Sequence, residues 1–172
     1  MKRHSKFTVD QLVLTGALTA LLEATKTALA AIPGVEAVTV LIIVYTQVLG
    51  WKMSLMIVFL FDMIETILYG FGLWTIDYLY IWPLLVLLAY QMRNQAGKIP
   101  SALLAGFFGL GFGAMCVPVT IAAFGRSAAL SWWLSGLWTD IIHGISNFLV
   151  TYLLKEPLEK GLCHAVKGQR GS

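Results

Sequence analysis

Charged residues are scarce in this sequence, and the signature motifs of several enzyme classes are missing from it. Only 12% of its 172 residues are Asp, Glu, Lys or Arg, whereas soluble domains carry about 25%. No GxxxxGK[ST] segment occurs, so the chain has no P-loop with which to hydrolyse ATP. The HExxH motif, the Cys and His spacings that bind zinc, and the nucleophile elbow are missing as well. These absences exclude a P-loop ATPase and argue against a metalloprotease or an α/β-hydrolase.

Cysteine is also rare, with only Cys116 and Cys163 in the chain. We expect no disulfide, because the first lies in an apolar stretch and the second in a polar segment on the other side of a bilayer midplane. The formal net charge of +3 comes from basic residues at the ends of apolar stretches. It gives no indication of nucleic-acid binding.

Apolar residues dominate instead, making up 58% of the chain. They form six stretches, approximately over residues 9–32, 35–49, 53–69, 78–92, 99–124 and 128–154. A hydrocarbon core of about 30 Å needs about 20 helical residues, and the second and fourth stretches are shorter than that. Such short spans can cross a bilayer in a thin region or lie among neighbouring helices rather than in lipid. The sequence therefore predicts a single all-α membrane domain of six transmembrane helices, with a cytoplasmic tail over residues 155–172.

The Lys and Arg residues are distributed unequally between the two sides of this predicted domain. Ten of the twelve lie on one side, Lys26 lies within the first stretch, and Arg126 lies on the opposite side. Because basic residues in short loops resist translocation, this asymmetry places both termini in the cytoplasm. We therefore expect a multi-pass protein of the bacterial cytoplasmic membrane, surrounded by the lipid bilayer.

Several charged residues fall inside the predicted spans. A charge at the centre of a bilayer costs about 3 kcal/mol on insertion scales, so each one is a candidate for function. With the predicted orientation most of them lie in the external half, which favours a pocket open to the outside over a pore. These polar residues are Glu23, Lys26, Glu36, Asp62, Glu65, Asp140 and His143.

The sixth stretch carries a polar stripe on one helical face. Its members follow one another at steps of three or four residues: Trp133, Gly136, Asp140, His143 and Asn147. Such a stripe could hydrogen-bond a polar ligand. Alternatively, Asp140 and His143 pair with each other or with Lys26 and only hold helices together. Glu23 and Lys26, three residues apart, could likewise neutralise each other.

Aromatic residues gather around one acid between residues 69 and 82. Trp74, Tyr78, Tyr80 and Trp82 surround Asp77 in the sequence, after a glycine-containing turn. An aromatic belt at the membrane interface is one interpretation. We favour an external binding loop or lid, since aromatic faces with an acid suit a flat or cationic ligand.

Glycines recur in the fifth stretch, at positions 106, 109, 111 and 113. No strand precedes them, so we expect close helix packing rather than a phosphate-binding loop. Pro118 is expected to kink this helix.

Together these features resemble the substrate-binding (S) component of an energy-coupling factor (ECF) transporter, over about residues 7–157. Small residues spaced by four in the first helix resemble the family's surface for its coupling protein: Gly16, Ala20, Ala24 and Ala28. Residues 32–36 are similar to the family's first external loop. Residues 69–74 and 80–83 resemble the end of its third helix and its external lid.

The resemblance implies that the chain is not itself an enzyme and captures a small organic micronutrient. We expect a vitamin or vitamin precursor of heterocyclic structure. A transmembrane coupling subunit and two ATPase subunits would energise its uptake. The implied ligand contacts are Trp74, Asp77, Tyr78, Trp82, Trp133, Asp140, His143 and Asn147, to which we add Glu36 and Glu65 at external helix ends. Nickel and cobalt members begin with Met-His, whereas this chain begins Met1-Lys2-Arg3, so we expect no metal and no cofactor.

Two alternatives remain open at the level of sequence. One is a small integral membrane enzyme that uses Asp140 and His143 as acid and base. The other is a structural subunit of a larger membrane complex, which would bind no ligand.

Overall fold

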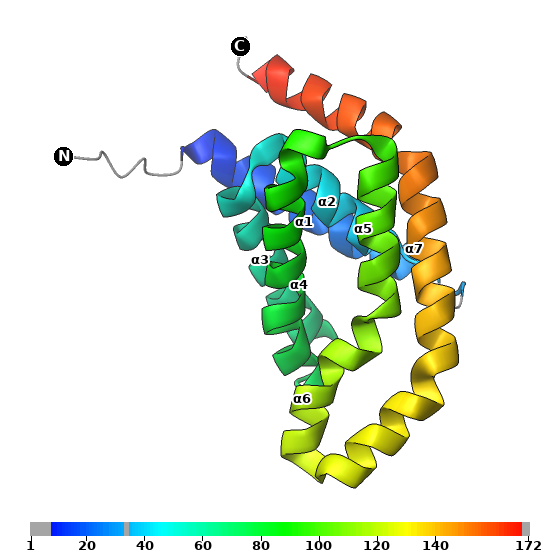
Figure 1. The fold of residues 1–172 in the computed structure, drawn as a ribbon. Helices are drawn as coiled ribbons and strands as arrows, with labels where there is room; N and C mark the ends of the chain where they lie inside the picture. Colours follow the sequence, from blue (N-terminus) through cyan, green and yellow to red (C-terminus); the bar gives the residue numbers. More distant parts are fainter. Residues whose placement is uncertain (1–7, 33–34, 170–172) are drawn as a thin grey trace, which may run out of the picture.

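The chain is all-helical in the computed structural model, which describes residues 8–32 and 35–169 (Figure 1). No strand occurs in these two ranges, so the predicted all-α fold class is confirmed. The helices are α1 (Val9–Leu29), α2 (Val38–Leu49), α3 (Trp51–Tyr69), α4 (Leu73–Gln91), the 3₁₀ turn η1 (Met92–Gln95), α5 (Lys98–Leu110), α6 (Phe112–Phe124) and α7 (Arg126–Gln169). Pro33 and Gly34, part of the predicted first external loop, lie outside the described residues.

Helix α2 is the centre of the bundle. Every residue from Val38 to Thr46 is buried, and the helix contacts α1, α3, α4, α5 and α7. An apolar helix without a polar face is expected to be enclosed by others. Its 12 residues span only about 18 Å. Of the two possibilities for a short span, the structure shows that α2 lies among neighbouring helices.

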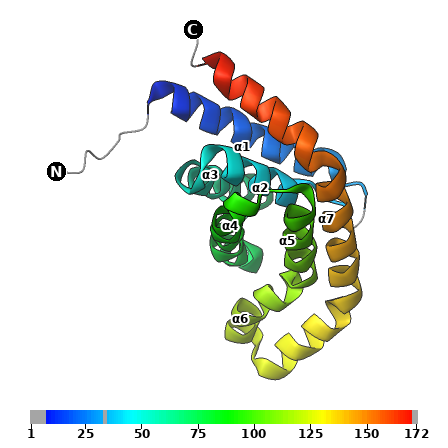
Figure 2. The same ribbon diagram turned by 45° about the horizontal axis from the view of Figure 1, so that its top comes forward.

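Helix α1 lies across the outside of the bundle. It begins with a capping box in which the Gln11 amide N–H donates to Thr8 Oγ1 and the Thr8 N–H donates to Gln11 Oε1. The face that includes Leu18 and Leu22 is buried, with α1 packed on α3 and α2. In Figure 2, α1 crosses over these helices and the C-terminal part of α7 runs beside it. Its opposite face is left uncovered by the described chain.

The predicted fifth span is two helices rather than one. The break falls at Gly111, which ends α5 and begins α6, whereas Pro118 lies inside the continuous helix α6. This break at Gly111 was not anticipated from the sequence. The glycine packing is confirmed: a Cβ at Gly106 would lie 3.2 Å from Phe148 Cβ, so α5 approaches α7 closely.

Helix α7 continues well beyond the predicted end of the sixth span. It has 44 residues and includes the segment expected as a tail. Figure 1 shows its C-terminal part changing direction, and Pro157 lies inside the helix. Proline removes one helical hydrogen bond and its ring clashes with the preceding turn, which accounts for the bend.

The fourth helix begins at Leu73, earlier than the predicted residue 78. The Gly72 N–H donates to Thr75 Oγ1 over 3.3 Å, which closes the first turn. The connection from α3 to α4 is therefore only residues 70–72, and Trp74 and Asp77 lie on a helix. The external loop or lid expected here is not formed, because its residues continue the helix.

Within residues 8–32 and 35–169, three helical segments are long and apolar enough to cross a membrane: Val9–Leu29, Leu73–Gln95 (α4 with η1) and Lys98–Phe124 (α5 with α6). Helix α2 is a shorter apolar helix. The composition of these segments is compatible with a membrane location.

We predict that Gly109→Ala destabilises the protein. The added Cβ would lie 2.8 Å from both Asn147 Nδ2 and the His143 carbonyl oxygen, and overpacking of this kind costs about 1–3 kcal/mol. Gly161→Ala is the matched control, because a Cβ there meets no atom within 4 Å. Thermal unfolding of both variants in detergent tests this packing, and an unchanged melting temperature for Gly109→Ala would contradict it.

Candidate functional site

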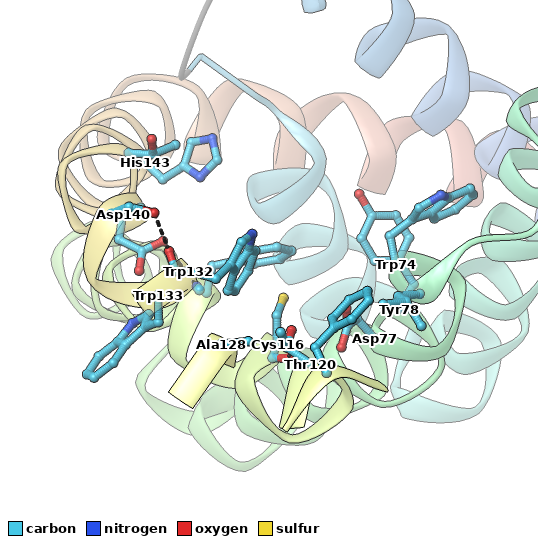
Figure 3. Close-up of a pocket in the computed structure, with 17 residues that line it drawn as sticks. Trp74, Asp77, Tyr78, Cys116, Thr120, Ala128, Trp132, Trp133, Asp140 and His143 are labelled. Atoms are coloured by element: carbon cyan, nitrogen blue, oxygen red, sulfur yellow. Dashed lines mark hydrogen bonds between the residues drawn. The ribbon is translucent and has the colours of Figure 1, made fainter. Parts of the chain in front are cut away.

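A cavity of about 750 Å³ lies between the first half of α4, helix α6 and the first part of α7 (Figure 3). This volume is typical of small-molecule sites, which range over about 300–1,000 Å³. Six of the residues predicted as ligand contacts line it: Trp74, Asp77, Tyr78, Trp133, Asp140 and His143. Figure 3 shows the α4 residues on one side of the cavity and Asp140 and His143 on the other. The fold thus brings together side chains that are distant in the sequence.

The α4 wall is aromatic with one acid. Trp74 and Tyr78 lie one helical turn apart, and their ring centroids are 5.4 Å apart at an edge-to-face angle of 70°. Asp77 lies on the same side of the helix and is 6% exposed. Its Oδ1 accepts a hydrogen bond from the Tyr80 hydroxyl over 2.9 Å, which fixes the carboxylate.

The α7 wall meets the broken helix at Asp140. The Gly113 amide N–H, in the first turn of α6, donates to Asp140 Oδ1 over 3.0 Å. Gly111 precedes this helix and has no side chain to cap it, so Asp140 supplies the cap from α7. The partial positive charge of the helix N-terminus in turn favours the negative charge of the carboxylate. Gly113 is required for this contact, because a Cβ there would lie 2.5 Å from Asp140 Oδ2.

One oxygen of this carboxylate remains unused. Asp140 is 6% exposed, and its Oδ2 has no hydrogen-bond partner in the described chain. An ionised carboxylate oxygen can only accept hydrogen bonds, and a buried one without a donor is costly. The arrangement therefore suits a ligand that brings a donor to this oxygen.

Four predicted contacts lie outside the cavity. Trp82 is 2% exposed and packs in the core, with ring centroids 5.2 Å from Tyr78 and 6.2 Å from Phe108. Asn147 Nδ2 donates to Glu36 Oε1 and to Thr39 Oγ1, each over 3.2 Å, and so joins α7 to α2. These side chains stabilise the packing beneath the cavity.

The fourth, Glu65, forms an ion pair with Lys26. This result selects among the pairings left open by the sequence: Lys26 of α1 binds an acid of α3 rather than Asp140 or His143. Glu23 and Asp62, one turn from Lys26 and Glu65 respectively, also lie beside the pair. The Glu23 carboxylate accepts a hydrogen bond from Thr27 over 3.2 Å.

Aromatic rings connect this ion pair to the cavity. Lys26 Nζ lies 5.5 Å from the Tyr78 ring centroid and 5.6 Å from those of Phe61 and Tyr69. A smaller cavity of about 310 Å³ includes Lys26 and Glu65 and is also lined by Trp74 and Tyr78. These two aromatic residues therefore form a wall with the larger cavity on one side and the ion pair on the other.

Several lining residues were not anticipated. They come from α6 and from positions of α7 beside the predicted stripe: Phe112, Gly113, Cys116, Thr120, Trp132, Ser135 and Thr139. Phe112, Cys116 and Thr120 are four residues apart, so helical spacing was a signal that could have identified them. Phe112 packs edge-to-face on His143, with ring centroids 6.3 Å apart.

We predict that Lys26→Met destabilises the protein more than Glu65→Gln does. Loss of the lysine leaves three neighbouring acids without a counter-charge. Because the Lys26 side chain is 31% exposed, we expect a cost below the value for a fully buried pair, about 3–5 kcal/mol. In Glu65→Gln the amide oxygen can still accept a hydrogen bond from Lys26. Glu23 and Asp62 remain to balance the charge of Lys26. Thermal unfolding in lipid nanodiscs measures both variants, and the reverse order of melting temperatures would show that the acids do not share this lysine.

Comparisons with profiles of known protein families, with curated proteins and with solved structures found no match. The chemistry of the cavity is therefore the basis for a proposed function.

Proposed function

We propose that this chain is the membrane-embedded substrate-binding subunit of an ECF-type transporter, which captures a small organic micronutrient from outside the cell. The observation that carries this proposal is the cavity, in which six of the residues suggested by the family resemblance converge. A concave site with aromatic walls and a few polar groups is typical of small-molecule binding. The three helical segments long enough to cross a bilayer support the membrane location.

The placement of basic residues supports the proposed orientation. Lys155 donates to the Ala96 carbonyl oxygen, and Lys98 Nζ lies 4.0 Å from the Tyr152 ring centroid. The basic segments around them thus share one end of the bundle, at the top of Figure 1. The cavity lies toward the other end, beside the turn from α6 to α7. A cytoplasmic location for the basic end gives the cavity an external position.

Uptake would depend on partner subunits. The chain has no P-loop, so ATP hydrolysis would come from two ATPase subunits acting through a transmembrane coupling subunit. The proposed docking face is the uncovered side of α1, where Gly16, Ala20, Ala24 and Ala28 are all exposed. Small residues let another helix approach the backbone closely within a membrane.

Catalysis by Asp140 and His143 is a less favoured function. Asp140 accepts a hydrogen bond from the Gly113 amide N–H, and His143 packs on the Phe112 ring. No hydrogen bond joins the two side chains in the described structure. A general acid and base would need to reach a common reacting group, and no contact in the site favours that role over ligand binding.

We predict that the protein purified in detergent carries a stoichiometric small organic compound, detectable by mass spectrometry of extracted metabolites. Trp74→Ala and Asp140→Ala should both lose it, because each removes part of a cavity wall. Trp51→Ala is the control, since Trp51 is 42% exposed and does not line the cavity. Equal amounts of compound in all four proteins would mean that it binds elsewhere, and a blank from all four would favour a structural subunit.

We predict that Ala24→Trp blocks uptake in cells that contain the partner subunits, while ligand binding by the isolated variant is unchanged. The large ring would prevent close approach of a partner helix. Leu21→Trp is the control, because Leu21 is already large and 49% exposed on a neighbouring part of α1. Normal transport by Ala24→Trp would show that this face is not the docking surface.

A further inference from the structure

The cavity contains negative charge without a matching positive one. Asp77 on α4 and Asp140 on α7 lie on opposite sides of it (Figure 3). Among the described residues that line it, none is a lysine or an arginine. His143 is the remaining lining residue with a basic side chain. An anionic ligand would meet two carboxylates here, which opposes its binding.

The nearest lysine does not change this balance. Lys26 lies behind the wall made by Trp74 and Tyr78 and is paired with Glu65. Glu23 and Asp62 lie beside that pair, so its surroundings hold more acid than base. The charge of Lys26 is therefore already offset and is not free to attract an anion into the cavity.

The cavity walls contain polar and aromatic groups that no other part of the described chain occupies, and these groups favour a specific kind of ligand. Asp140 Oδ2 is buried and lacks a donor, so an N–H group satisfies both its hydrogen bonding and its charge. The rings of Trp74, Tyr78 and Phe112 supply flat walls, and aromatic faces attract cations as well as other rings. Charge and shape point to the same chemistry. Trp133 Nε1, a buried donor without a partner in the described chain, also lines the cavity and would take an acceptor on the ligand.

We propose that the ligand is a planar aromatic cation that carries N–H donors, with a donor directed at Asp140 Oδ2. This inference rests on the proposed function, since it names the substrate class of the same cavity. Asp140 is then the residue that recognises the charge, and Asp77 adds attraction from the opposite wall.

Three probes of nearly equal shape differ in charge: benzamidinium, benzamide and benzoate. Differences in their affinities therefore report the effect of ligand charge. Binding is measured on the full-length protein in nanodiscs by saturation-transfer NMR titration. We expect benzamidinium to bind at least about tenfold more tightly than benzamide, as a charge-assisted hydrogen bond requires, and benzoate more weakly than either. Asp140→Asn should remove most of the benzamidinium preference, because it retains an oxygen for the Gly113 amide and loses the charge.

Two further variants make the test decisive. Asp10→Asn removes the same charge at an exposed position at the start of α1 and should leave all three affinities unchanged. Asp77→Asn should weaken the binding of benzamidinium. This variant therefore tests the role of negative charge in the cavity independently, should Asp140→Asn fail to fold. Benzoate binding as tightly as benzamidinium, or a benzamidinium preference kept in both lining variants, would overturn the proposal.

The identity of the co-purified compound distinguishes failure of the proposed cationic ligand class from failure of the proposed binding function. A neutral or acidic compound that is lost in Trp74→Ala would overturn the cationic class and leave the binding function standing. Absence of any compound, together with no binding of the three probes, would overturn both.

Discussion

The close approach of α5 and α6 to α7 is the contact on which the arrangement of the cavity depends. Glycine at positions 106, 109 and 113 removes the Cβ atoms that would otherwise meet α7 at 3.2 Å or less. The same approach brings Asp140 to the first turn of α6, where it accepts the Gly113 hydrogen bond. A wider spacing would leave both the helix end and the carboxylate without partners. Packing and polar chemistry are thus fixed by one set of small residues.

Buried charge is handled differently in the two halves of the molecule. Between α1 and α3, Lys26 compensates Glu65 directly and lies among aromatic rings. Between α4 and α7, Asp77 accepts a hydrogen bond from a hydroxyl and Asp140 accepts one from a backbone amide. Neither acid is paired with a cation in the described structure. A compensated pair holds helices together, whereas an uncompensated acid in a cavity is available to an incoming molecule. The contrast separates the structural role of Glu65 from the role proposed for Asp140.

Apolar runs in the sequence predicted the helices because burial and helical spacing leave a direct trace in residue order. The shortness of α2 left burial among helices as one of two possibilities, and the stripe of α7 correctly grouped Trp133, Asp140 and His143. The break at Gly111 was missed because a glycine inside an apolar run is compatible with both a continuous and an interrupted helix. The sequence could not identify the ion-pair partner of Lys26, because that partner depends on which helix packs beside Lys26 in the fold. Likewise Trp82 and Asn147 have the composition of binding residues, and only packing shows that they are core.

The shortness of α2 has a consequence for how such a chain enters a membrane. With 12 residues it covers about 18 Å of a hydrocarbon core near 30 Å thick, and its buried surface faces five other helices. In a bilayer, this segment alone would leave its polar ends within the acyl chains during synthesis. In the proposed membrane location, stable integration of α2 would therefore depend on its association with neighbouring helices.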